Sequence, residues 1–162
     1  MKINLRYLPN KLSRKDKKKQ FHSLKKSRRL YKKGIYFNRK PVNSFHSKKS
    51  QHIINAEKIY NVEKIGASKE LANATGCSKQ ALAKIINKGE GAYYSSGSRP
   101  NQSAQSWGIA RLASSISSGK AAAVDYNILE KGCKPNSKAL TLAKKAKRKY
   151  GYGTRRVMKV NV

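Results

Sequence analysis

The chain has 162 residues, enough for one domain or one domain with arms, and carries 38 Lys and Arg against 7 Asp and Glu, a formal charge of +31. A compact monomer with this charge repels itself, so we expect its partner to be a polyanion or an acidic protein surface. No apolar run approaches the length of a membrane span and the first twelve residues lack the apolar core of a signal peptide, which argues against membrane insertion.

The charge is unevenly distributed along the chain. Residues 1–49 carry a net +17, residues 50–137 carry +5 and residues 138–162 carry +9. This pattern predicts a basic N-terminal arm over 1–49 (a helix plus an extended connector), a helical core domain over 50–137, and a basic C-terminal helix and tail over 138–162. The expected fold is mainly α: a small helical domain, including a helix-turn-helix-like pair, with extended basic arms.

The first long helix is predicted from about Arg14 to Lys33, because Ser13 is a good N-cap and Gly34 can close the last turn. Its apolar stripe is thin, and like charges four residues apart repel one another. Such a helix needs counter-charge from a partner. The alternative, a solvated basic helix, is weakened because the charge is so one-sided. Residues 1–12 are expected to form an edge strand or an arm, and residues 35–45 a short strand or an extended connector.

The far end of the chain is also basic. Ser137 predicts the start of a helix from Lys138 to Tyr150, and Thr154–Val162 alternates as a strand does. The residues expected to bind a polyanion or partner lie in the two basic helices and the tail: Arg14, Lys17, Lys18, Lys25, Arg28, Arg29, Lys144, Lys147, Arg148, Arg155 and Arg156.

Two short helices are predicted between residues 68 and 88, separated by Gly76 and ending before Gly89. A helix-turn-helix needs a small residue in its first helix, a Gly in its tight turn and apolar residues at set places in its second. Ala72, Gly76 and Leu82 fit that pattern, but the same spacing describes any two short helices packed at a steep angle. If the pair reads DNA, the presented face is Ser78, Lys79, Gln80 and Lys84.

A Gly- and Ser-rich loop around residues 89–103 precedes a helix predicted from Ala104 to about Ser117, capped by Ser103, with Trp107 on its core-facing side. A rigid loop with one Arg beside a helix start is a candidate anion site. That site would consist of Ser96, Ser98 and Arg99. The alternative is an ordered loop whose tyrosines simply pack on the core.

Nothing in the sequence indicates catalysis. The acidic residues are scattered, and the chain has no nucleophile elbow, P-loop or metal-binding motif. His46 and His52 lack further ligands at metal-binding spacing, so we expect no metal, no cofactor and no small-molecule substrate. Cys77 and Cys133 are expected to be buried thiols in a reducing compartment.

Two-thirds of the chain carries a resemblance to a known family. The most specific segment is GAYYSSGSRPNQ, residues 91–102, and Ser106-Trp-Gly108 and residues 119–125 (GKAAAVD) support it. On these motifs, residues 39–142 resemble an uncharacterised domain family encoded by large double-stranded DNA viruses of algae and amoebae. The resemblance implies a viral origin and brings no established activity or catalytic residues.

Charge and resemblance together predict a non-enzymatic structural protein of a large DNA virus particle. It would be a basic minor capsid or inner-shell protein that bridges capsid subunits, the genome, or both. We expect it to be synthesised in the host cell and to lie on the inner face of the capsid or core. The alternative is a virion DNA-binding protein that condenses or recognises double-stranded DNA through the basic arms and the helix-turn-helix.

Overall fold

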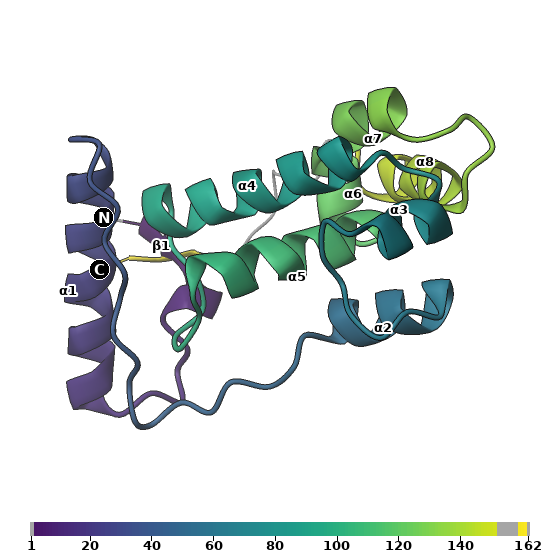
Figure 1. Ribbon diagram of the computed structural model, residues 1–162. Helices are drawn as coiled ribbons and strands as arrows, with labels where there is room; N and C mark the ends of the chain where they lie inside the picture. Colours follow the sequence, from purple (N-terminus) through teal and green to yellow (C-terminus); the bar gives the residue numbers. More distant parts are fainter. Residues whose placement is uncertain (1, 152–158, 162) are drawn as a thin grey trace. The chain divides into compact units, whose positions relative to one another are not determined.

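The computed structural model describes residues 2–151 and 159–161, and its described part is mainly helical, as the sequence predicts (Figure 1). It contains eight α-helices, one 3-10 helix and one two-stranded sheet. These elements form two units: residues 2–48, 90–107 and 159–161 in the first, and residues 49–89 and 108–151 in the second. Helices α4 (Lys79–Ser95) and α5 (Ala104–Ile116) contribute residues to both.

The first unit is built around helix α1 (Arg14–Tyr31), which Ser13 caps by accepting the backbone N–H of Asp16 at 3.1 Å. Strand β1 (Lys2–Asn4) pairs antiparallel with β2 (Lys159–Asn161), and a 3-10 helix, Leu5–Tyr7, follows β1. The rest of the expected C-terminal strand, residues 154–158 and 162, lies outside the described residues. Residues 35–46 contain no helix or strand, in agreement with an extended connector.

The N-terminal segment is part of a packed unit, which differs from the expected arm. Ile3, Tyr7, Leu8 and Leu24 form a buried cluster in which none is more than 4% exposed. Trp107 is only half-buried and meets Tyr7 edge-on, with ring centroids 6.1 Å apart. Burial of these apolar side chains is a favourable term large enough to hold a basic segment against its own repulsion.

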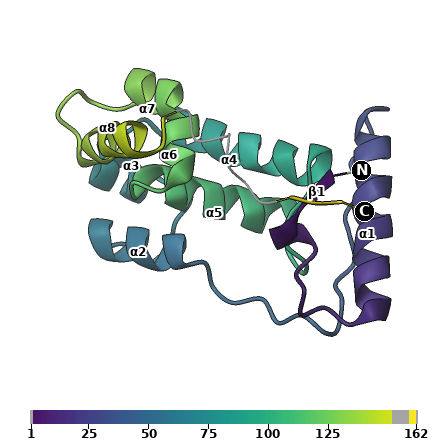
Figure 2. The same cartoon turned by 180° about the vertical axis from the view of Figure 1, so that it is seen from behind.

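The second unit contains the shorter helices. They are α2 (Gln51–Tyr60), α3 (Lys69–Thr75), α6 (Lys120–Val124), α7 (Tyr126–Gly132) and α8 (Lys138–Tyr150). Ser50, Ser68 and Ser137 cap α2, α3 and α8 by accepting backbone N–H groups. Helix α6 packs against α7 and α8, as the view from behind shows (Figure 2).

Helix α8 belongs to the core of this second unit, whereas the sequence placed this helix outside the core domain, in a basic C-terminal segment. Ala139, Leu140, Ala143 and Ala146 are at most 4% exposed and join the main buried cluster. The basic residues of α8 occupy its other side, so the helix is amphipathic. Packing and charge are therefore combined in one element.

Helix α4 does not end at Gly89, as the sequence predicted, but continues through Gly89 and Gly91 to Ser95. The reason is a close approach between helices, because a Cβ on Gly89 would lie 2.6 Å from the Cα of Gly108 in α5. Gly89 permits this contact and has helical neighbours on both sides. The Gly/Ser loop is consequently shorter than expected and begins after Ser95.

The two cysteines form a disulfide, which corrects the expectation of free thiols. The chain segments at Cys77 and Cys133 pair antiparallel, since the N–H of Ser78 donates to the carbonyl of Gly132 at 2.7 Å and the N–H of Lys134 donates to that of Gly76 at 2.9 Å. The covalent link joins positions 56 residues apart in the sequence. No rule of cysteine spacing identifies a pair so widely separated.

Across residues 2–151 and 159–161, no helix combines the length and the apolar character that a membrane crossing requires.

Candidate nucleic-acid interface

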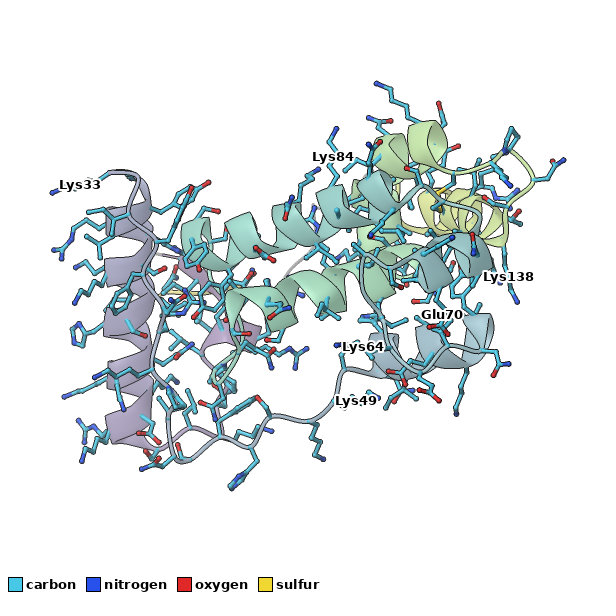
Figure 3. All side chains as sticks on the ribbon, in the orientation of Figure 1. Lys33, Lys49, Lys64, Glu70, Lys84 and Lys138 are labelled. Carbon is cyan, nitrogen blue, oxygen red and sulfur yellow. A yellow bond between two sulfur atoms is a disulfide. The ribbon has the colours of Figure 1, made fainter. Side chains whose placement is uncertain are left out.

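Helix α1 presents the densest positive charge of the first unit. Nine of its 18 residues are Lys or Arg, and Asp16 is its one carboxylate. Gln20, Leu24 and Ser27 are buried along one side, so the basic residues are turned toward solvent along the rest of the helix. Basic side chains project along the length of α1 in Figure 3, where Lys33 extends outward just beyond its end.

An open groove of about 690 Å³ runs along this helix. Its lining residues are His22, Lys25, Lys26, Arg28, Arg29, Lys32 and Ser95. Lys25, Arg29 and Lys32 recur at the spacing of one helical face and are exposed, whereas Arg28 is half-buried. The groove therefore presents a row of cations with the repeat that a phosphate backbone can follow.

Two contacts fix the walls of the groove. The Nε of Arg28 donates to the carbonyl of Ser96 at 2.8 Å, which attaches α1 to the segment that follows α4. The ammonium of Lys26 lies 4.6 Å from the ring centroid of Phe37, a cation–π contact with the connector. These contacts order two of the groove cations while leaving the row of Lys25, Arg29 and Lys32 open to solvent.

The first unit has little negative charge with which to neutralise this helix. Its described residues include 19 Lys and Arg against Asp16 and Glu90 alone. Asp16 is committed to structure, because it accepts the backbone N–H of Ser44 at 2.8 Å. Hydrogen bonds from Ser44 lower the pKa of Asp16 below its ordinary value of 3.8, and Lys19 contributes in the same direction. A bound polyanion would supply the missing counter-charge.

The structure brings together part of the predicted polyanion-binding set. Lys25, Arg28 and Arg29 share the groove, while the remaining α1 members are exposed outside it: Arg14, Lys17 and Lys18. In the second unit Lys144, Lys147 and Arg148 are exposed on α8, and the ammonium of Lys147 lies 4.2 Å from the ring centroid of Tyr126. Arg155 and Arg156 lie outside the described residues.

The helix-turn-helix-like pair consists of α3 and the start of α4. Gly76 has φ +77°, and a Cβ there would lie 2.6 Å from the Cβ of Ser137, so only glycine fits this turn. Ser78 caps α4, because its hydroxyl oxygen accepts the N–H of Ala81 at 3.1 Å; this hydroxyl therefore already has a partner within the fold. The other predicted DNA-reading residues are exposed, namely Lys79, Gln80 and Lys84. Lys84 extends away from α4 in Figure 3.

The candidate anion site is not assembled in the predicted form. Ser98 is 1% exposed, and its hydroxyl accepts from Arg39 and donates to the carbonyl of Arg99, both at 2.8 Å. Ser96 contributes its carbonyl to Arg28. Ser96 and Arg99 are both exposed, and Arg99 lines an open hollow of about 480 Å³ with Arg6 and Lys11.

The loop acts instead as a clamp on the connector. Asn101 accepts the backbone N–H of Val42 at 2.7 Å and donates to the carbonyls of Val42 and Phe45 at 3.1 and 2.6 Å. Arg39 fills the space behind it: the guanidinium donates to Ser27, Ser98 and the carbonyl of Tyr93, and lies 3.8 Å from the Tyr93 ring centroid. Burial is the main cause that lowers the pKa of Arg39.

A second buried polar centre lies at Asp125. The sequence indicated that Asp125 neutralises nearby Lys or Arg side chains, which the structure confirms, but gave no sign of the role of Arg39. Asp125 is 1% exposed and receives a bidentate contact from Arg111, at 2.8 and 2.9 Å, with Lys88 at 3.3 Å. Ser115 donates to the same carboxylate at 3.1 Å. The partners lie 12 to 59 residues from Arg39 and 10 to 37 residues from Asp125 along the chain, so no local motif indicates either set of contacts. Both are structural centres that hold segments together.

Within the described ranges, 2–151 and 159–161, no group of three or more His, Cys, Asp or Glu side chains is placed to hold a metal ion.

Comparison with known proteins gives one match. A model of a family of unknown function, DUF5824, matches residues 5–151, which is most of the chain. No curated protein and no solved structure matches this chain.

Proposed function

The chain belongs to the family of unknown function DUF5824, and we propose that it is a non-enzymatic structural protein of a large DNA virus particle that binds the genome through its basic helices. The observation that carries the proposal is the α1 groove, where six His, Lys and Arg side chains and one Ser line an open surface. A phosphate backbone carries a continuous row of negative charges that Lys and Arg side chains neutralise.

The viral setting comes from the sequence resemblance in residues 39–142. In that setting the protein lies on the inner face of the capsid or in the core, where it meets both the shell and the packaged DNA. Its contacts with DNA are to phosphates. Its affinity for DNA therefore depends strongly on salt and weakly on base sequence.

Bridging is a second role, favoured by a separate observation. Each unit has a net positive charge and its own basic helix, α1 in the first and α8 in the second. A protein that joins a capsid subunit to the genome, or two capsid subunits to each other, needs two such surfaces. Acidic capsid proteins are the partners for whichever surface does not hold DNA.

Base recognition is a third possibility within the same function, and it is supported by the exposed Lys79, Gln80 and Lys84 at the start of α4. Lys and Gln side chains on a helix can contact base edges in the major groove. This role would add sequence preference to the charge-based affinity of α1.

The proposal of a non-enzymatic role draws on three of the seven acidic residues, which are engaged in structural contacts. Asp16 holds Ser44, Asp125 holds Arg111, and Glu57 pairs with Lys49 at 2.9 Å. Each of these carboxylates has a structural partner, and none of the three faces a second carboxylate or a His in an arrangement typical of acid–base catalysis.

The test is a binding measurement with a charge-matched control. Changing Lys25, Arg29 and Lys32 to Ala removes three exposed groove cations, whereas changing Lys58, Lys64 and Lys69 to Ala removes three exposed cations of the second unit. We expect the first variant to bind a labelled DNA duplex at least tenfold more weakly than the second at about 0.15 M salt. Equal affinities of the two variants would contradict a role for the groove.

A further inference from the structure

Next to the α1 groove lies an exposed row of tyrosine rings. The centroids of Tyr31 and Tyr36 are 6.1 Å apart, and those of Tyr36 and Tyr94 are 5.1 Å apart, with interplanar angles of 39° and 37°. Tyr36 is 67% exposed and Tyr31 is 37% exposed. Ile35, the neighbour of Tyr36, is 50% exposed, so the row belongs to an apolar patch on a surface that is otherwise basic.

The row is held in place from beneath. Tyr94 meets the buried Tyr93 edge-on at 5.0 Å, and its hydroxyl donates to the Oδ1 of Asn38 at 3.0 Å. Tyr93 is itself held in place, because the Arg39 guanidinium lies over its ring and its hydroxyl accepts the Arg39 backbone N–H at 3.0 Å. Tyr36 is therefore a ring supported by ordered neighbours and open to solvent.

The row and the groove share one end of α1. Tyr31 lies in the sequence between the groove residues Arg28 and Lys32, and Tyr94 precedes the groove residue Ser95. The groove cations, which suit a phosphate backbone, therefore lie beside the tyrosine rings. This combination is typical of surfaces that bind single strands, in which unpaired bases stack on aromatic side chains while basic residues hold the backbone.

We propose that the Tyr31–Tyr36–Tyr94 row and the adjoining α1 groove form a binding site for single-stranded nucleic acid. The inference rests on the proposed function and adds to it a stacking site for unpaired bases at this end of α1, beside the cations that also bind a duplex. A base stacks on the exposed face of Tyr36, and the flanking phosphates lie along Arg28, Arg29 and Lys32. A duplex keeps its bases stacked inside, so it uses the cations but not the tyrosine.

The experiment measures fluorescence anisotropy of the full chain with a labelled 15-nucleotide oligothymidine and with a labelled hairpin duplex, at about 0.15 M salt. Tyr36→Ala is expected to lower affinity for the single strand fivefold or more and to change duplex affinity less than twofold. Tyr36→Phe keeps the ring and should bind the single strand as the wild type does. Tyr150→Ala is the comparison variant, because Tyr150 is 37% exposed beside a cation, Lys149, and lies on α8, outside the residues that line the α1 groove; its loss should change single-strand affinity less than the loss of Tyr36 does.

Each remaining outcome has one meaning. If Tyr36→Ala binds both probes as the wild type does, or loses both equally, the stacking site is wrong while DNA binding by charge stands. If the wild type binds neither probe, the proposed function itself fails. If Tyr36→Ala weakens binding to poly-glutamate as much as binding to the single strand, the row serves an acidic protein partner. That result would overturn the assignment to nucleic acid.

Discussion

Arg39 is a buried cation in a unit already rich in positive charge, and among the described residues no carboxylate pairs with it. It is tolerated because three oxygen acceptors and the Tyr93 ring replace the water that it loses. These contacts join α1, the connector and the segment that follows α4. Arg39 is thus a residue on which the shape of the groove depends.

Replacing Arg39 should therefore destabilise the protein. Arg39→Ala leaves Ser27, Ser98 and the Tyr93 carbonyl without their charged donor, and we expect a loss of about 2–4 kcal/mol in the free energy of unfolding. Arg99→Ala removes an exposed Arg from the same loop and should change the free energy of unfolding by less than about 0.5 kcal/mol. Denaturant titration followed by Trp107 fluorescence measures both, and equal effects would refute the central role of Arg39.

Asp16 links stability to acid. Its pKa is lower in the folded protein than the ordinary 3.8, so protonation favours the unfolded chain. Its contribution is fully present above about pH 4 to 5 and is lost as the pH falls through its folded pKa, below 3.8. We expect Asp16→Asn to be less stable than the wild type at pH 7, and the difference between them to shrink at pH 3. Denaturation midpoints at the two pH values measure this, and a gap that is constant or wider at pH 3 would contradict it.

At the scale of elements, short-range signals in the sequence predicted most helices. Ser13, Ser68 and Ser137 each preceded a helix that the structure confirms, because an N-cap acts within three residues of its own position. The prediction was wrong for α4, since Gly89 is a stop signal locally but a contact point with Gly108 in the structure. That contact is between residues 19 apart in the sequence, beyond the reach of a local rule.

The two glycines of α4 provide a matched pair of variants. Gly89→Ala places a Cβ against the Gly108 backbone and should cost about 1–3 kcal/mol, because the helices must separate. Gly91→Ala meets nothing within 4 Å and should stabilise the protein by about 0.5–1 kcal/mol through helix propensity. Thermal midpoints of the two variants, compared with the wild type, decide the matter. Shifts of the same sign would show that the Gly89–Gly108 approach is not what requires glycine.

At the scale of the whole molecule, composition predicted the basic partner surface but not how the chain divides. The first unit combines three separate stretches of sequence, and the N-terminal basic segment is folded into it by Leu24 and its neighbours. Charge runs alone favour an interpretation as arms, since they carry no information about a contacting segment 68 residues away, such as that between Arg28 and Ser96. Three residues of the groove, Lys25, Arg28 and Arg29, are among those that the sequence predicted to bind a polyanion, whereas the groove itself and the tyrosine row beside it depend on the fold.

The net charge of +31 also predicts how stability responds to salt. Screening weakens the self-repulsion of the folded protein, so the thermal midpoint should rise as NaCl increases from about 0.01 to 0.5 M. Light scattering, run in parallel, separates unfolding from aggregation. A midpoint that falls or stays constant would mean that repulsion is already relieved within the fold.

The central claim is that the α1 groove binds nucleic-acid phosphates, and the salt dependence of duplex affinity tests it most directly. We predict a linear fall of log K with log salt, with a slope that shows several phosphate contacts, about 0.9 per contact. The Lys25, Arg29 and Lys32 triple-Ala variant should reduce the magnitude of this slope by about 2–3, while the Lys58, Lys64 and Lys69 control leaves it unchanged. A wild-type slope near zero, or the same slope in both variants, would contradict the account.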